Sequence, residues 1–287
     1  MKSLILVLKG FFMGIANVIP GVSGGTIALI LGIYEEFISS ISNIFKEFKK
    51  SISFLIPIFI GMGLSIILLS RIIDRAYKII PIPTVLFFMG LVVGGIPLVI
   101  KRINNSKDKI TSSNYIIFII TFLLVLSLSL SKIFISSFSN VSFTNMNILS
   151  YILLFIVGIV SSATMIIPGI SGSLVLMMLG YYYPVINTIK EITSFKNLFS
   201  NFIILFIFGL GVLLGIAVIS KMIEYLFKKH EKKTYFTVLG FVIASVIAIP
   251  ISSLIEVKNI NLNIGQLLLG IITFIIGLII SYKLGEK

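Results

Sequence analysis

The sequence of 287 residues contains no cysteine and only one histidine. Without cysteine, the chain has no disulfide, no thiolate metal site and no thiol redox centre. Charged residues are scarce as well, because they make up 11% of the chain, whereas soluble domains carry about 25%. The sequence also lacks a cluster of metal-ligating side chains. We therefore expect no bound metal, no cofactor and no water-soluble fold.

Hydrophobic residues are abundant: they make up 57% of the chain, and the mean hydropathy is +1.16. The apolar runs are continuous over roughly 17–23 residues, which suits membrane helices of about 20 residues and not the alternating strands of about 10 residues found in membrane β-barrels. The sequence therefore predicts an all-α, multi-pass integral membrane protein. The predicted segments are residues 3–19, 25–41, 52–70, 84–100, 114–136, 149–167, 174–189, 201–220, 235–253 and 263–282.

The net charge of +13 is concentrated in the spacers between these segments. Basic residues gather in short polar stretches such as "FKEFKK" (45–50) and "KKHEKK" (228–233). Membrane topology and contact with anionic lipid explain such loops. We therefore expect membrane lipids as partners and no nucleic acid.

Two stretches of the chain resemble each other at an offset of 148 residues. Residues 10–34 read "GFFMGIANVIPGVSGGTIALILGIY", and residues 158–182 read "GIVSSATMIIPGISGSLVLMMLGYY". The sequence therefore predicts two repeats, residues 1–140 and 141–287, which together form one transmembrane domain. Each repeat has one broken element followed by three long helices.

Glycines extend the match downstream. Residues 61–63 ("GMG") match residues 209–211 ("GLG"), and after a slip of two residues Gly90 matches Gly240. The spacings Gly90–Gly94 and Gly211–Gly215 are typical of the GxxxG motif, in which small residues let two membrane helices approach closely. We interpret these glycines as packing positions.

The shared core of the two stretches, Ile-Pro-Gly-x-Ser-Gly, is expected to break a helix. Proline removes a helical N–H and clashes with the preceding turn, and glycine permits positive φ. Non-helical backbone persists at membrane depth only inside protein or beside a wet cavity. Paired breaks of this kind mark the substrate sites of transporters. We therefore predict one re-entrant helical hairpin in each repeat, with the two tips meeting near the middle of the membrane.

The distribution of basic residues favours hairpins over two complete crossings. If both broken elements are hairpins and the N-terminus is cytoplasmic, 15 of the 23 Lys and Arg residues lie inside and 7 outside. If both elements span, the loops carry 11 on each side. The positive-inside rule therefore predicts two inverted repeats, each a re-entrant hairpin plus three transmembrane helices, with both termini in the cytoplasm.

The hairpin tips combine glycines, hydroxyls and the first amides of a helix. A helix N-terminus carries free N–H groups and the positive end of the helix dipole, so it binds anions. Glycine allows an anion to approach the backbone closely. We therefore expect an anion site at the two tips, formed by Pro20, Gly21, Ser23, Gly24, Gly25, Thr26, Pro168, Gly169, Ser171, Gly172 and Ser173.

The two motifs, "GIANVIPGVSGGTIALILGIYEEFI" and "PGISGSLVLMMLGYYY", resemble those of the PopT-type polyprenyl-phosphate transporter family, and the resemblance covers essentially the whole chain. It implies a bacterial plasma-membrane protein that returns undecaprenyl phosphate, the lipid carrier of cell-envelope synthesis, from the outer to the inner leaflet. The tips would then bind the phosphate headgroup. The family usually has Asp at the position of Asn17, so this chain lacks a carboxylate there, and its coupling cation is unknown.

Further charged residues are candidates for handling this cargo. Arg71 and Arg75 would capture phosphate at the outer mouth, and they share one face if their segment is helical. Lys221 would do the same at the inner mouth, because Arg grips phosphate with two hydrogen bonds and Lys acts as a point charge. Glu35 and Asn17 are candidates for coupling or gating.

Two other functional classes match parts of the sequence. "GVSGG" (21–25) matches the G-x-S-x-G pattern of serine hydrolases, but a serine nucleophile needs a nearby base, and the only histidine, His230, lies in a charged loop. We therefore do not expect an enzyme. A small-anion channel or exchanger fits the same broken helices, and the residues by themselves leave that alternative and a lipid phosphate equally open.

Overall fold

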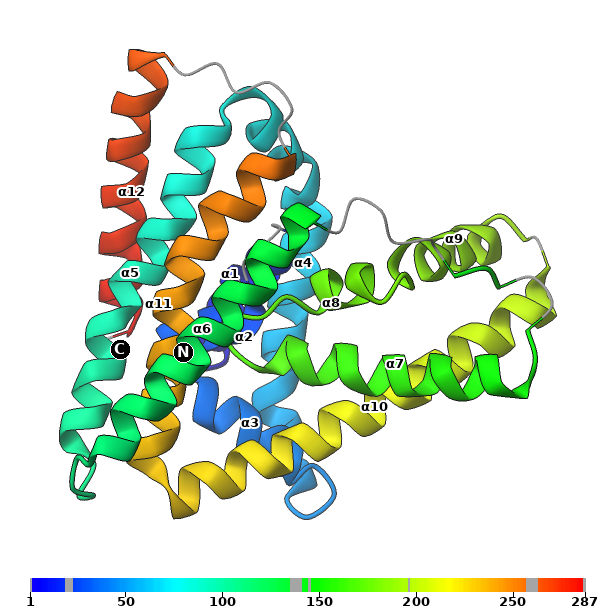
Figure 1. Ribbon diagram of the computed structural model, residues 1–287, viewed down its shortest axis with the longest axis horizontal. Coiled ribbons are helices and arrows are strands. Elements are labelled where there is room, and N and C mark those ends of the chain that lie inside the picture. Colours follow the sequence, from blue (N-terminus) through cyan, green and yellow to red (C-terminus); the bar gives the residue numbers. More distant parts are fainter. Residues whose placement is uncertain are drawn as a thin grey trace.

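The structure is a computed structural model that describes residues 2–18, 23–134, 141–143, 146–195, 197–256 and 263–285. These residues form twelve helices and no strand (Figure 1). The first six are α1 (Lys2–Val18), α2 (Gly24–Ile30), α3 (Tyr34–Ser42), α4 (Phe48–Ile79), α5 (Pro81–Asn105) and α6 (Ser112–Phe134). The second six are α7 (Ile148–Ile166), α8 (Gly172–Met178), α9 (Tyr182–Thr193), α10 (Leu198–Lys229), α11 (Glu231–Glu256) and α12 (Ile264–Gly285).

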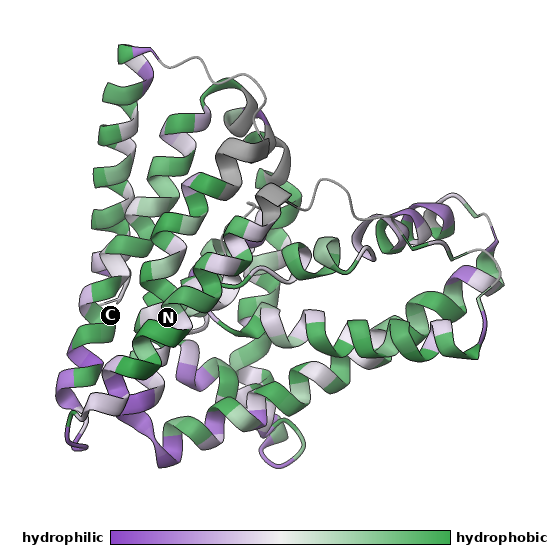
Figure 2. Cartoon of the chain, in the orientation of Figure 1, coloured by the Kyte–Doolittle hydropathy of each residue, from purple (hydrophilic) through white to green (hydrophobic). Residues whose placement is uncertain are grey.

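Seven helices in the described part of the chain are long and apolar enough to cross a membrane, namely α4, α5, α6, α7, α10, α11 and α12. Large apolar side chains cover their outer faces. Ile67 on α4 is 76% exposed, for example, and Leu213 on α10 is 65% exposed. Figure 2 shows hydrophobic residues along the helices and hydrophilic ones gathered at helix ends, above all where α5 and α10 finish and α6 and α11 begin. The predicted all-α, multi-pass membrane protein is confirmed.

The two halves contain the same series of helices. A helix of 17 or 19 residues is followed by one of 7 residues and then by one of 9 or 12 residues. Three long helices complete each half, with 32, 25 and 23 residues in the first and 32, 26 and 22 in the second. This order agrees with the predicted broken element followed by three long helices.

Each half has a second break that the hydrophobic pattern did not reveal. Residues 25–41, which we expected as one segment, form α2 and α3 with a turn between them, and Gly32 in that turn has φ +69°. The matching Gly180, between α8 and α9, has φ +77°. Glycine adopts positive φ without steric cost and so ends a helix. The single-segment prediction was wrong because the apolar run continues through the turn.

Another correction concerns the spacers. The segment 71–78, expected as a polar spacer, continues α4 without interruption, and Lys221 lies within α10. At 1.5 Å per residue, a helix of 32 residues is about 48 Å long, more than the roughly 30 Å of a bilayer core. The charged ends of α4 and α10 therefore extend beyond the apolar span.

Helix packing follows the same scheme in both halves. α1 packs against α4 as α7 packs against α10, while α5 packs against α12 as α11 packs against α6. Glycines make these contacts close. A Cβ added at Gly90 would collide with the carbonyl oxygen of Phe274, and one at Gly240 with that of Phe118. The packing role predicted for the GxxxG glycines is confirmed, because a Cβ at Gly94 or at Gly211–Gly215 would likewise meet a facing backbone.

The contacts also correct the register of the repeat. Gly61 faces the carbonyl oxygen of Val7, and the glycine that faces the equivalent Phe155 is Gly211, not Gly209. The slip of two residues therefore already applies at the start of α10, upstream of where the sequence match placed it. The "GxG" triplets misled the alignment because their two glycines can be matched in either register.

Candidate functional site

The first break lies between α1 and α2, and polar side chains satisfy the start of α2. Asn17, in the last turn of α1, accepts a hydrogen bond from the Gly24 N–H through its Oδ1 at 3.0 Å. Ser23 precedes α2 in an extended conformation, and its Oγ accepts from the Gly25 N–H at 3.2 Å. Two of the first amides of α2 are therefore capped by neutral groups. Asn17 therefore lies at the first break, and its side chain fixes the backbone at the start of α2.

The second break lies between α7 and α8 and is less completely capped. Pro168 and Gly169 are buried, and Gly169 has φ +82°. Ser171 occupies the N-cap position of α8, but its side chain makes no capping hydrogen bond to the described backbone. Its Oγ lies 2.8 Å from the Oγ of Ser173, and Ser173 is exposed. The hydroxyls of this tip are therefore accessible.

The two breaks lie against each other. The N–H of Gly169 donates to the Oγ1 of Thr26 at 2.7 Å, and Thr26 is 1% exposed. A Cβ added at Gly25 would lie 2.6 Å from the carbonyl oxygen of Ile166, so only glycine fits there. The hydroxyl of Tyr34 donates to that same carbonyl at 3.2 Å. The described residues beside the two breaks are therefore in direct contact.

The two tips differ in exposure. Every residue of α2 is buried, whereas in α8 only Gly172 and Val175 are buried. Figure 1 shows the reason: α2 lies in the middle of the bundle, while α7 and α10 extend away from it with α8 and α9 above them. The anion-binding groups predicted at the first break are enclosed, whereas at the second Ser173 is exposed and Ser171 is half-buried.

Glu35 lies at the start of α3, away from the tips. The hydroxyl of Tyr235, on α11, donates to one of its carboxylate oxygens. Arg102, near the end of α5, lines the same small cavity as Glu35 and Tyr235. The predicted coupling or gating residue thus joins α3 of the first half to α11 of the second.

Two other predicted residues lie on long helices. Arg75 on α4 and Lys221 on α10 are exposed, and within the described residues no hydrogen bond or salt bridge joins either of them to a break. The backbone of Arg71 belongs to α4, so it shares a helical face with Arg75 as expected, but its side chain is outside the described part. Pro20 and Gly21 also lie outside the described residues.

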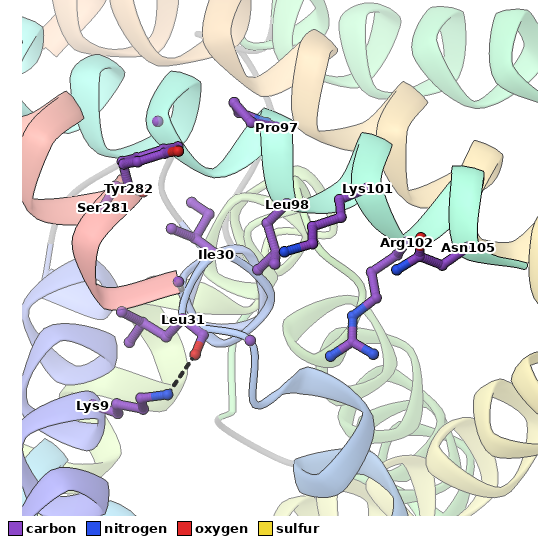
Figure 3. Close-up of a pocket in the computed structure, with 13 residues that line it drawn as sticks. Lys9, Ile30, Leu31, Pro97, Leu98, Lys101, Arg102, Asn105, Ser281 and Tyr282 are labelled. Atoms are coloured by element: carbon purple, nitrogen blue, oxygen red, sulfur yellow. Dashed lines mark hydrogen bonds between the residues drawn. The ribbon is translucent and has the colours of Figure 1, made fainter. Parts of the chain in front are cut away.

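A cavity of about 490 Å³ contains cations that our interpretation of the sequence did not assign to any site (Figure 3). It is lined by Lys9, Lys101 and Arg102, and the Nζ of Lys9 donates to the carbonyl oxygen of Leu31 at 2.7 Å. In the sequence, Lys101 and Arg102 directly follow the predicted segment 84–100 and are typical of a positive-inside spacer. The signal for Lys9 was present, because an ionisable residue within an apolar membrane segment is costly and marks a functional position.

Fold and site together define a multi-pass helical membrane protein of the broken-helix kind, in which two interrupted segments meet inside the bundle. Comparison with known proteins is more specific. The chain belongs to the VCA0040-like family, described as undecaprenyl phosphate translocase-like, which it matches over residues 13–263.

Two relatives carry the name polyprenyl-phosphate transporter. The chain is 38% identical to the protein from Staphylococcus aureus over 283 residues, which is 98% of this chain and 95% of that one. It is 29% identical to the protein from Vibrio cholerae over 252 residues, which is 83% of this chain and 74% of that one. No solved structure matches the chain. The family resemblance expected from the two motifs is therefore confirmed.

Proposed function

We propose that this protein carries undecaprenyl phosphate, or a similar polyprenyl phosphate, from the outer to the inner leaflet of the bacterial plasma membrane for cell-envelope synthesis. The observation that carries the proposal is the meeting of two interrupted helices in a chain whose family relatives are named polyprenyl-phosphate transporters. The cargo is a partner whose charged headgroup needs a polar path, whereas its tail remains soluble in lipid.

The energetics of the headgroup explain why the path is built from broken helices. A phosphate monoester carries about 1.5 to 2 negative charges at neutral pH, and roughly 30 Å of hydrocarbon separates the two leaflets. Freed backbone N–H groups and hydroxyls replace the water around the phosphate at membrane depth. The protein therefore needs only a polar slot that is open sideways to the bilayer.

In this proposal residues 1–140 and 141–287 are inverted repeats, and each contributes a re-entrant hairpin. The matched helix series and the paired glycine contacts of α5–α12 and α11–α6 support it. The turns at Gly32 and Gly180 support it too. The returning helix α2 has only 7 residues, about 10 Å at 1.5 Å per residue, which suits a half-crossing. Both termini are cytoplasmic.

We infer that this conformation accepts the phosphate from the outer side. The second hairpin enters from the outer side in this topology, and its tip is the one with exposed hydroxyls. Ser171 and Ser173 therefore receive the phosphate first. Asn17 and Ser23 occupy the amides of the inner tip until the phosphate replaces them.

The remaining candidates keep auxiliary roles in the proposal. The backbone of Pro168–Gly169 shapes the slot, and Gly24, Gly25 and Gly172 give access to it. Arg71 and Arg75 gather the headgroup outside, and Lys221 does so inside. Glu35 gates the path through its hydrogen bond to Tyr235.

The proposal is for a transporter and not an enzyme. The Ser23 side chain is 5% exposed and bonded to the Gly25 N–H, and His230 lies at the junction of α10 and α11. A serine nucleophile would need a base within hydrogen-bond reach. The capping arrangement therefore supports a structural and binding role for this serine.

The test is transport by the purified protein in liposomes that contain fluorescent undecaprenyl phosphate. We expect protein-dependent transfer of the lipid between leaflets, with inorganic phosphate and chloride competing weakly. Liposomes that dissipate a phosphate or chloride gradient but move no lipid would instead establish the small-anion channel or exchanger.

The inverted topology can be tested separately, because the chain has no native cysteine. Lys107→Cys and Asn263→Cys place single thiols at exposed positions before α6 and α12. The hairpin topology predicts that an impermeant maleimide reaches the thiol at position 107 only from the cytoplasm and the thiol at position 263 only from outside. If both broken elements span the membrane, the two thiols are labelled from the same side.

A further inference from the structure

A strongly basic cavity lies beside the turn between α2 and α3, and none of the described residues at the two breaks lines it (Figure 3). Three cations from two helices converge on it: Lys9 from α1, and Lys101 and Arg102 from the end of α5. Figure 3 shows Lys101 directed toward the α2–α3 turn and Arg102 extending beside it. Polar residues at the end of α5 and on α12 complete the wall, namely Asn105, Ser281 and Tyr282.

The carboxylates that interact electrostatically with these cations, Glu36 with Lys9 and Glu35 with Arg102, lie on α3 outside the lining of this cavity. No carboxylate is among its described lining residues, and the three cations form no salt bridge with another described residue. Lys9 is 6% exposed, and its one hydrogen bond to a described protein atom is to the Leu31 carbonyl. An ammonium group has three N–H donors. A buried ammonium that uses one of them on a neutral carbonyl, beside two further cations, is arranged for an anion.

The three cations of the cavity are present in the first half of the chain and not at the equivalent positions of the second half. In the second half the position equivalent to Lys9 is Val157, at the offset of 148 residues. The offset of 150, which relates Gly90 to Gly240, makes Ile251 and Ser252 the counterparts of Lys101 and Arg102. A feature required by the shared architecture would recur in both halves. The absence of all three cations from the second half indicates a role that is needed on one side of the membrane.

The positive-inside rule accounts for Lys101 and Arg102 but not for Lys9. Basic residues at the ends of spans orient a membrane protein, and Lys101 and Arg102 lie near such an end, in the last two turns of α5. Lys9 is enclosed within an apolar helix, where a charge is costly without a partner. Its position on the wall of the same cavity therefore calls for a ligand.

We propose that this cavity is a second binding site for a phosphate monoester, at which the lipid carrier is held as it leaves the path on the cytoplasmic side. This role rests on the proposed function. A guanidinium binds phosphate oxygens through two hydrogen bonds, and two ammonium groups match the remaining charge. Ile30, Leu31 and Leu98 line the apolar part of the wall, beside which the first isoprene unit lies. The shared chemistry is that of a phosphate monoester, which a carrier lipid or free phosphate could supply.

Protection of a thiol placed in the cavity tests this site without requiring transport. Asn105→Cys provides a single exposed thiol on the cavity wall of the full-length protein. Ser112→Cys, exposed at the start of α6 and outside the cavity, is the control for general effects of the ligand. The probes are farnesyl phosphate, farnesol, inorganic phosphate and phosphatidylglycerol micelles. We expect farnesyl phosphate to slow maleimide labelling at position 105 but not at position 112, and farnesol to slow neither.

A charge-matched pair of variants then assigns the effect to the cavity cations. On the Asn105→Cys background, Lys101→Gln with Arg102→Gln removes two cavity charges. Lys107→Gln with Lys109→Gln removes two exposed charges near the same end of the molecule. Each charge-assisted hydrogen bond contributes at least about tenfold to affinity. The cavity pair should therefore weaken protection by farnesyl phosphate at least about tenfold, and the loop pair by less than about twofold.

The outcomes separate this proposal from the proposed function. Equal loss of protection in both pairs, or no protection at all, overturns the cavity site even if the protein transports the lipid. Protection by inorganic phosphate or phosphatidylglycerol at the same concentrations overturns its assignment to the carrier lipid. Protection by farnesyl phosphate, in a protein that moves no polyprenyl phosphate between leaflets, leaves the binding site standing and refutes the transport function.

Discussion

The hydrogen bond between Thr26 and Gly169 joins the two breaks, and its removal should destabilise the conformation described here. Thr26→Val preserves the shape of the side chain but removes the acceptor of the Gly169 N–H. Both residues are buried, so the amide would lose its partner away from water. An unsatisfied buried donor costs about 1–3 kcal/mol. We expect the free energy of unfolding to fall by about that amount.

Thr188→Val is the matched control for this change. Thr188 is also buried, at 4% exposed, but its hydroxyl donates to the Pro184 carbonyl one turn earlier in α9. Removing that hydroxyl leaves no backbone amide unpaired. The control should therefore lose only the net contribution of one hydrogen bond, about 0.5–1.5 kcal/mol, and less than Thr26→Val. Unfolding in increasing sodium dodecyl sulfate, followed by far-UV circular dichroism, measures both variants.

A second assay asks whether the bond also holds the two tips together. A loss of about 1–3 kcal/mol corresponds to a shift of roughly 5–150-fold between two conformations that differ in this contact. A thiol introduced as Ser173→Cys should therefore react faster with maleimide when Thr26→Val is added. If Thr26→Val is as stable as Thr188→Val and labelling at position 173 is unchanged, the contact between the breaks carries neither stability nor conformational control.

Three further predictions follow from the same contacts. Ser23→Ala should lower the free energy of unfolding by about 0.5–2 kcal/mol because a helix cap is lost. Ser171→Ala should instead reduce transport and leave stability nearly unchanged. Equal losses of stability for the two variants in detergent unfolding would contradict this difference. Asn17→Asp should raise stability by about 0.3–1 kcal/mol, because a carboxylate at the N-terminus of α2 is favourable. If this position couples a cation, the variant should also make transport dependent on pH or sodium. Transport that matches the wild type at every pH and sodium concentration would mark Asn17 as structural. Gly211→Ala should lower the free energy of unfolding by about 1–3 kcal/mol through overpacking against Phe155. Gly209→Ala meets open space and should leave the unfolding midpoint unchanged or higher. A larger loss of stability for Gly209→Ala than for Gly211→Ala would refute the corrected register.

The membrane class and the positions of the two Pro-Gly breaks could be predicted from the sequence, because both depend on local chemistry. Long apolar runs are compatible only with a lipid environment, and helices satisfy their own backbone there. Proline and glycine at residues 20–21 and 168–169 act on the backbone at their own positions. The repeat was visible for the same reason, since matching breaks need matching residues. The packing glycines followed from spacing along single helices.

Other features depend on distances between segments far apart in the chain, so only the tertiary structure decided them. Thr26 meets Gly169 across 143 residues, and Lys9 reaches the cavity of Lys101 and Arg102 because α1 and α5 flank the same turn. The repeat register at Gly211 became clear only when the facing carbonyl was known. The enclosure of one tip and the exposure of the other also lie beyond local sequence, because similar motifs acquire different burial from the helices packed around them. Sequence determines which polar groups are freed within the apolar segments, and the packing of distant helices determines which of them find a partner in the protein and which stay open to a ligand.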